Sequence, residues 1–299
     1  MNLPQGYAPL TIDKYSEYMR FFRALPVPTA DLTFTNLWGW AEYFGLGLSF
    51  REDSCWICQT RPEPAFWVPA GDWAAMNWKA HPEIRRGVEL LRAPDELGVL
   101  LEERLPGRVR AVSDRDQWEY LYDRRELAEL PGAKFHKKKT HVNGFRRLYG
   151  EDYRILDLEH PERIEDVLKL QEQWCQWRDC ENSPSLLAEN EAIFRVIGNW
   201  AKLPGLRGGA LYVDGTVGAF SVGELVGDML VVHFEKARGE LKGAYQAINQ
   251  AFVNHSAVDA ALVNREQDTG ELGLRYAKET YNPVGFLKKS RLVIAADAE

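Results

Sequence analysis

Hydrophobic and polar positions along the chain form short blocks that predict a mixture of helices and strands. In the first half, a helical pattern covers Ile12–Leu25 and is ended by Pro26 and Pro28, and Thr33–Phe44 forms an aromatic helix or turn. Asp114 is expected to cap a segment that runs into Glu119–Asp123. The other expected elements of this half are strands at Gly47–Phe50, Cys55–Thr60, Ala65–Pro69 and Val109–Val112, and helices at Asp72–Lys79 and Pro94–Leu105.

The second half has a more regular pattern, which predicts the element order β-α-α-β-β-β-α-β-α-β. Asp214 and Gly215 predict a tight hairpin turn between two of its strands. The expected strands are Tyr153–Leu158, Gly209–Val213, Thr216–Leu225, Asp228–Phe234, Ala260–Val263 and Gly285–Ile294. The expected helices are Pro161–Arg178, Ser185–Ala201, Gly243–His255 and Gly270–Thr280.

This order of elements resembles the GNAT acyltransferase fold, and the first half is compatible with a degenerate copy of it. The predicted fold class is therefore α+β, with two GNAT-like α/β halves in tandem. We expect a degenerate N-terminal domain at residues 1–148 and a C-terminal domain at residues 149–299 that carries the active site. The duplication is inferred from element order, because the two halves share no convincing sequence repeat.

Charge is distributed unevenly over the 299 residues. The net charge of −7 argues against a protein that coats nucleic acid by charge alone. Residues 1–150 carry 21 Lys and Arg against 20 Asp and Glu, whereas residues 151–299 carry 16 against 24. One basic island, Lys134–Arg147, contains six Lys and Arg residues, two His and no acid.

Several classes of protein are not supported by the sequence. The N-terminus lacks the basic and apolar regions of a signal peptide, and no run of about 18 apolar residues occurs, so we expect a cytoplasmic protein. Four cysteines in so long a chain do not indicate a disulfide framework. A zinc site is not expected, because the odd spacing of Cys55 and Cys58 in a strand puts them on opposite faces. Motifs of serine hydrolases, P-loop NTPases and zinc proteases are absent.

The segment Val263–Phe286 contains the largest concentration of polar residues that can take part in binding or catalysis. It follows a short apolar run that predicts a buried strand, and polar side chains just past such a strand commonly form ligand sites in α/β proteins. The polar residues of this segment are Asn264, Arg265, Glu266, Asp268, Glu271, Arg275, Lys278, Tyr281 and Asn282.

Three stretches, Tyr120–Phe145, Gly243–Asn249 and Val263–Pro283, resemble the soluble relatives of the C-terminal domain of phosphatidylglycerol lysyltransferase, and Thr33–Trp40 fits the N-terminal half of these relatives. That family is similar to the Fem-type peptidoglycan aminoacyltransferases. The resemblance implies transfer of an aminoacyl group from aminoacyl-tRNA to an acceptor. The membrane-embedded flippase part of the lysyltransferases has no counterpart in this sequence.

A local match adds a possible catalytic residue. Tyr281 followed by Gly285 and Phe286 resembles the end of a GNAT domain, where the tyrosine protonates the leaving group. The stretch Arg238–Ala244 retains part of a GNAT phosphate loop, with Arg238, Lys242 and Gly243, although its glycine spacing differs. An acyl-CoA donor is therefore the alternative to aminoacyl-tRNA.

Two further side chains are candidates for acid–base work. Glu235 and His233 lie two apart in a predicted strand, so they are expected to share one face, and either can accept a proton. The alternative is a core histidine and a loop-capping glutamate.

Donor or substrate binding is predicted for a larger set. Arg275 and Lys278 are three apart on a predicted helix and can hold a phosphate or carboxylate, unless they form a solvated helix face. Lys137, Lys138 and Lys139 are the candidate RNA contacts, unless the basic island is a solvated linker. The full set of predicted binding residues is Arg238, Lys242, Gly243, Asn249, Asn264, Arg265, Glu266, Asp268, Arg275 and Lys278.

The sequence thus favours a transferase that moves an aminoacyl or acyl group to an amine or hydroxyl by direct attack. Two alternatives stay open, an acetyl-CoA-dependent N-acetyltransferase and a non-catalytic ligand-binding protein of GNAT descent. The expected partners are a tRNA or CoA donor and a small-molecule, peptide or lipid acceptor, with no metal.

Overall fold

The computed structural model describes residues 2–297, which form two compact units. The first unit contains the described residues up to Glu119, the segment Gln267–Gly270, and the described residues from Leu287 onward. The second contains Tyr120–Glu266 and Glu271–Phe286. Each unit is built around a mixed seven-stranded sheet. Within residues 2–297, no helix is both long enough and apolar enough to span a bilayer.

The sheet of the first unit has the strand order β1-β2-β3-β4-β5-β14-β6, antiparallel except between β4 and β5. Its strands are β1 (Ala8–Pro9), β2 (Gly47–Phe50), β3 (Ser54–Gln59), β4 (Ala65–Gly71), β5 (Val88–Pro94), β14 (Lys289–Ile294) and β6 (Val109–Ser113). Its helices are α1 (Tyr15–Phe22), α2 (Phe34–Gly39), α3 (Ala41–Phe44), α4 (Pro82–Arg86) and α5 (Asp95–Arg104). Aromatic side chains dominate the core, and Trp56, Trp67, Tyr18 and Phe34 are almost fully buried.

A cluster of ionised side chains is buried in this unit. Lys289 is fully buried, contacts Asp31, and lies 2.5 Å from the Glu119 carboxylate. Arg92 pairs with Asp31 at 2.5 Å and stacks over the ring of Trp67. Burial raises the pKa of Asp31, but Lys289 and Arg92 outweigh this effect and hold the pKa below its usual range. Two acids and two bases therefore balance in charge.

The second unit has the strand order β13-β7-β12-β11-β10-β9-β8, in which β11 and β12 are parallel. Its strands are β7 (Glu119–Asp123), β8 (Asp152–Ile155), β9 (Leu206–Val213), β10 (Thr216–Val226), β11 (Met229–Ala237), β12 (Leu262–Asn264) and β13 (Gly285–Leu287). Its helices are α6 (Arg124–Glu129), α7 (His136–Tyr149), α8 (Pro161–Trp177), α9 (Pro184–Gly198), α10 (Ala244–Ser256) and α11 (Leu272–Glu279).

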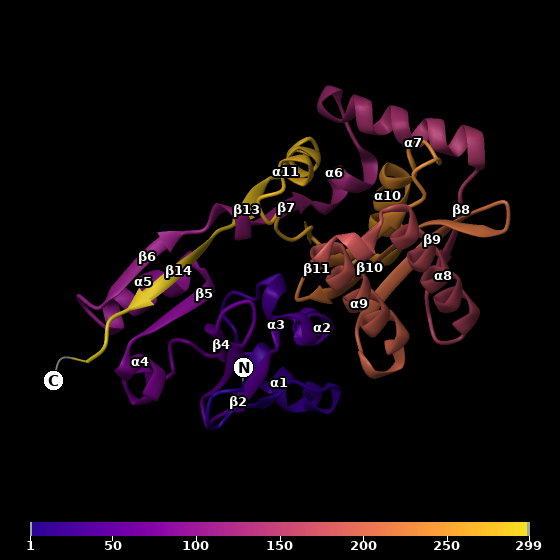
Figure 1. Ribbon diagram of the computed structural model, residues 1–299. Coiled ribbons are helices and arrows are strands. Elements are labelled where there is room, and N and C mark those ends of the chain that lie inside the picture. The colour runs from indigo at the N-terminus through magenta and orange to yellow at the C-terminus, as the bar shows by residue number, and fades with distance from the viewer. Residues whose placement is uncertain (1, 298–299) are drawn as a thin grey trace. The chain divides into compact units, whose positions relative to one another are not determined.

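From β8 to β13 the elements follow the predicted order β-α-α-β-β-β-α-β-α-β. Helix α10 packs on the sheet, where Ile248 and Phe252 join the buried side chains of β9 and β11. Figure 1 shows α7 beyond α10, with α8 and α9 on the other side of the strands. The N-terminus of α10 lies close to α7, because a Cβ atom on Gly243 would stand 2.5 Å from the carbonyl oxygen of His141.

Some predicted elements were wrong. Asp72–Lys79 is not an α-helix, and only a short 3-10 turn at Trp78–Ala80 forms there. Asp114 makes no side-chain cap, and the segment that follows becomes strand β7. The basic island forms helix α7 rather than a linker. Strand β5 was not predicted.

The two units exchange strands along the sequence. The expected last strand divides at Lys288, so β13 joins the second sheet and β14 is inserted between β5 and β6 in the first. In return β7 is inserted between β13 and β12. The compact units therefore meet in the sequence at Glu119 and Tyr120, whereas the expected domain boundary follows residue 148.

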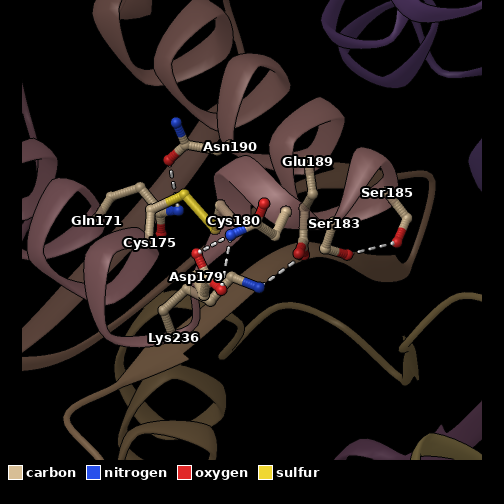
Figure 2. Close-up of a disulfide and its surroundings, with 10 residues drawn as sticks. Gln171, Cys175, Asp179, Cys180, Ser183, Ser185, Glu189, Asn190 and Lys236 are labelled. Carbon is tan, nitrogen blue, oxygen red and sulfur yellow. Dashed lines mark hydrogen bonds and ion pairs between the residues drawn. A yellow bond between two sulfur atoms is a disulfide. The ribbon is translucent and has the colours of Figure 1, made fainter.

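A single disulfide among the described residues joins Cys175 and Cys180, at the C-terminal end of α8. Figure 2 shows it near the ion pair between Lys236 and Glu189, whose charged atoms are 2.7 Å apart. The two cysteines are only five positions apart in the sequence, so the bond links a local turn and connects no distant elements. Cys55 and Cys58 are unpaired and buried.

Candidate active site

The candidate site lies where two parallel strands of the second unit diverge. Pairing of β11 with β12 runs from Met229 opposite Leu262 to Val231 opposite Asn264 and ends there. Strand β11 continues through His233 and Glu235, while the chain after β12 turns away at Arg265 and Glu266. Ligand sites of open α/β sheets form at the carboxyl ends of neighbouring parallel strands.

Hydrogen bonds to the backbone fix the turn after β12. The amide oxygen of Asn264 accepts from the Glu266 N–H at 2.8 Å, and Glu266 adopts a left-handed φ of 57°. The Lys278 ammonium donates to the carbonyls of Arg265 at 2.5 Å and Glu266 at 3.1 Å. Lys278 is buried and its ammonium holds this turn, so it is not part of a solvated helix face, which was the alternative to its predicted role in binding a phosphate or carboxylate. Arg275, three residues earlier on α11, is half-buried.

Glu235, Arg265 and Asn249 form one contact network. The Arg265 guanidinium donates to one carboxylate oxygen of Glu235 at 3.1 Å, and the Asn249 amide donates to the other at 3.1 Å. The same guanidinium lies 4.7 Å from the centre of the Tyr281 ring, in a cation–π contact with that side chain. Burial lowers the pKa of Arg265, but Glu235 together with Tyr281 and Tyr122 outweighs this effect and raises it. These residues come from β11, α10 and two loops, and the structure brings their side chains into contact.

His233 occupies an irregular position in β11. Val222 of β10 pairs with Phe234 and Gly223 pairs with Val232, so His233 has no partner in the ladder. His233 and Glu235 were expected to share contacts on one strand face. Instead, His233 contacts Glu224 and Glu266, whereas Glu235 contacts Arg265 and Asn249.

The environment of His233 fixes its charge. Its Nδ1 lies 2.8 Å from the Glu266 carboxylate and its Nε2 lies 2.8 Å from the Glu224 carboxylate. Carboxylates only accept, so both ring nitrogens carry a proton. Burial lowers the pKa of His233, but the two hydrogen bonds outweigh it and raise the pKa to about 9. The prediction that His233 accepts a proton at neutral pH is therefore wrong.

Tyr281 lies between two cations. Its side chain is buried, and Lys138 Nζ lies 4.0 Å from its ring centre. Burial raises the pKa of Tyr281 far more than Arg265 lowers it, so the phenol keeps its proton at neutral pH. A neutral phenol beside a guanidinium can donate a proton or a hydrogen bond to a developing oxyanion.

Two buried polar atoms next to Glu235 have no hydrogen-bond partner among residues 2–297. One is the Ser221 hydroxyl, whose residue pairs directly with Glu235 in the ladder, and the other is the Asn249 amide oxygen. Both residues are at most 1% exposed. Buried polar atoms are normally satisfied, so unpartnered atoms beside a carboxylate are typical of a site that receives a ligand or water.

The partial phosphate loop before α10 has other roles. The Arg238 guanidinium donates to Glu240 at 2.7 Å and to Thr216 at 3.2 Å. Gly243 has a φ of 85° and its α-carbon faces the backbone of α7, so the glycine is required for helix packing. Lys242 is exposed. Because of these contacts, Arg238 and Gly243 are not directed at a site that a pyrophosphate could occupy.

Asp268 does not join the site. It belongs to the short segment Gln267–Gly270 of the first unit, where it is fully buried. Its carboxylate accepts from the Gly270 N–H at 2.9 Å and pairs with Arg115 at 3.2 Å. These contacts give Asp268 a structural role, and its role in donor binding stays a prediction.

The three lysines predicted to contact RNA do not behave alike. Lys137 and Lys139 are exposed on α7, whereas Lys138 is half-buried against Tyr281. Lys138 thus joins the site.

Two site residues were missed from the sequence. Tyr122 of β7 lies 5.9 Å from the Arg265 guanidinium, and Glu224 holds His233. The sequence signal for Glu224 was a lone acid in an otherwise apolar strand. No cluster of three or more His, Cys, Asp or Glu able to hold a metal ion occurs among the described residues.

Solved structures show the same fold. A conserved protein of unknown function from Bacteroides thetaiotaomicron is 29% identical, with a TM-score of 0.85 over 96% of this chain and 99% of that one. L-PGS from Bacillus licheniformis is 12% identical, with a TM-score of 0.62 over 99% of this chain and 95% of that one. FemX is 8% identical, with a TM-score of 0.58 over 96% of each chain. The predicted α+β class with two GNAT-like halves in tandem is confirmed.

Sequence comparison gives the family. An uncharacterised protein of Mycoplasmoides gallisepticum is 28% identical over 173 residues, which span 57% of this chain and 54% of that protein. The family described as phosphatidylglycerol lysyltransferase, C-terminal, matches residues 22–292. The chain therefore belongs to the phosphatidylglycerol lysyltransferase C-terminal family.

Proposed function

We propose that the protein transfers an aminoacyl group from aminoacyl-tRNA to an amine or hydroxyl acceptor by direct attack. The observation that carries this proposal is the group of Glu235, Arg265 and Tyr281 at the divergence of β11 and β12, with unpartnered polar atoms beside it. Membership of a lysyltransferase family supports an aminoacyl donor.

Each side chain has a role in this proposal. Tyr281 protonates the oxygen that leaves the donor ester, because burial keeps its phenol neutral. Arg265 stabilises negative charge that develops on the ester. Glu235 and Asn249 hold Arg265 in position and present the unpartnered amide oxygen to the substrate.

An acetyl-CoA-dependent reaction is the second candidate. The positively charged end of α10 and the exposed Lys242 are compatible with a phosphate. The engagement of Arg238 with Glu240, and of Gly243 with α7, argues against a CoA pyrophosphate there. We therefore place this function second.

The test is a transfer assay on the purified protein. A panel of aminoacyl-tRNAs with isotope-labelled amino acids is mixed with amine and hydroxyl acceptors, and acetyl-CoA is run in parallel. We expect label to move from one or more aminoacyl-tRNAs and the rate to fall by about 100-fold in Tyr281→Phe. Lys169→Met, a surface change on α8, is the matched control.

Two results would contradict the proposal. Transfer from acetyl-CoA alone would replace the aminoacyl donor by CoA. An aminoacyl transfer that survives unchanged in Glu235→Gln, Arg265→Gln and Tyr281→Phe would remove the site from the reaction.

A further inference from the structure

Lys138 lies on the inward face of helix α7. It precedes Val142 by four residues and Phe145 by seven, and both of these side chains are buried. This spacing puts all three on one stripe of the helix, whereas Lys137 and Lys139 lie off it and are exposed. A lysine in an otherwise apolar stripe directs its amine toward the interior of the unit.

The amine of Lys138 has no acid partner. Within residues 2–297, no carboxylate lies within ion-pair distance of its Nζ, which instead stands over the Tyr281 ring. Glu235 is occupied by Arg265 and Asn249, and Glu126 of α6 pairs with Lys134 one turn earlier. The ammonium of Lys138 is therefore uncompensated.

The surroundings of the Lys138 amine disfavour its protonated form, because the cationic Arg265 is already nearby. Arg265, from the loop after β12, lies on the same Tyr281 ring, and Tyr122 and Tyr281 are both neutral. Burial, followed by the charge of Arg265, lowers the pKa of Lys138 to about 8. A substantial fraction of the amine is then neutral near physiological pH, as a general base requires.

The other bases of the site are already engaged. His233 is held as a cation between Glu224 and Glu266. Glu235 accepts from both Arg265 and Asn249, so taking a proton would break its ion pair. Among these three side chains, the neutral amine of Lys138 can accept a proton without breaking an ion pair.

We propose that the Lys138 amine is the catalytic base that accepts the proton of the attacking amine or hydroxyl. This role rests on the proposed transfer reaction. The acceptor N–H or O–H bond breaks as the new bond to the donor carbonyl carbon forms, and the proton moves to the Lys138 nitrogen. The ester C–O bond breaks, and the leaving oxygen takes the Tyr281 proton. The Lys138 ammonium then returns a proton to the phenolate, which restores both residues.

The first experiment needs no substrate. Trace acetic anhydride labels neutral amines, and mass spectrometry of digests reports the labelling rate of each lysine as a function of pH. We expect Lys138 to titrate near pH 8, well below the ordinary lysine value of about 10.4. In Arg265→Gln the midpoint of Lys138 should move upward, because a neighbouring cation is removed. A Lys138 that titrates near the ordinary lysine value of about 10.4 overturns the proposal.

The second experiment uses the transfer assay. Lys138→Arg keeps the positive charge but cannot release its proton, so it should lose about 100-fold or more in kcat, as Lys138→Met does. Both variants should also lose the rise in rate through pH 8, while Lys169→Met keeps it. Wild-type kcat in Lys138→Arg would mean that a fixed charge suffices, and would overturn the proposal.

The experiments distinguish failure of the proposed function from failure of the role proposed for Lys138. A protein whose Lys138 titrates near pH 8 but which transfers nothing contradicts the proposed function and, with it, the catalytic role. An active protein whose Lys138 titrates near pH 10 contradicts the role of Lys138 alone.

Discussion

A histidine hydrogen-bonded by a carboxylate on each ring nitrogen is a cation, and His233 has this arrangement with Glu224 and Glu266. The sequence placed His233 two residues before Glu235 on one predicted strand, and both lie in β11. It did not reveal the protonation state, because Glu224 and Glu266 lie 9 and 33 residues away in the chain. The residue type identified His233 as a titratable group, whereas its neighbours Glu224 and Glu266 determine its protonation state.

His233 should make stability depend on pH. Its folded pKa of about 9 is above its ordinary value of 6.5, so its contribution is fully present below about pH 6.5 and is lost as the pH rises through 9. We expect the free energy of unfolding of the wild type to fall by on the order of 3 kcal/mol over this range relative to His233→Gln.

The measurement is urea denaturation of both proteins between pH 6 and 10. The lowered pKa of Lys138 gives the opposite slope above about pH 8, and it cancels in the difference between the two proteins. Parallel stability curves for wild type and variant would show that His233 is not held as a cation.

Helix α7 shows what an element-level prediction missed. Its charge density made Lys134–Arg147 an island of basic residues, although Lys138, Val142 and Phe145 recur at helical spacing. The long strands β9, β10 and β11 were predicted because their apolar runs are continuous. Strands β7 and β5 were not predicted. Each pairs with a strand from a distant part of the sequence, β12 for β7 and β14 for β5, although β5 also pairs with the nearby β4.

The contact between α7 and α10 should depend on Gly243. An alanine there would need a left-handed backbone and would place its Cβ 2.5 Å from the His141 carbonyl oxygen. We expect Gly243→Ala to destabilise the protein by more than about 1 kcal/mol in thermal or urea unfolding. Gly239→Ala, where a Cβ meets nothing within 4 Å, is the control and should change little. Equal stability of the two variants would contradict the packing described for α10.

On the scale of the whole molecule, each compact unit is built from segments that are separated in the sequence. The order of elements in the second half predicted the GNAT-like architecture, because each helix and strand there carries its own local pattern. The exchange of β7 and β14 was not predicted, since a strand pattern does not say which sheet the strand joins. The candidate site does not depend on this exchange, because the residues that form it all lie in the second unit.

Strand exchange should make the two halves interdependent. A fragment of residues 1–148 lacks β14, and a fragment of residues 149–299 lacks β7, so each loses a strand from inside a sheet. We expect each fragment alone to be unfolded or aggregated by circular dichroism and size-exclusion chromatography. Produced together, they should associate and regain the spectrum of the intact chain. A fragment that is monomeric and cooperatively folded by itself would contradict the strand order.

The buried group of Asp31, Arg92, Glu119 and Lys289 has a consequence for ionic strength. Two of its members are fully buried and the other two nearly so or half-buried, so dissolved salt has little access to the charges between them. The ion pair of Arg207 with Asp259, by contrast, is open to solvent and is screened by added salt. The contribution of these buried ion pairs to the stability of the first unit should therefore change little between low and high salt concentration.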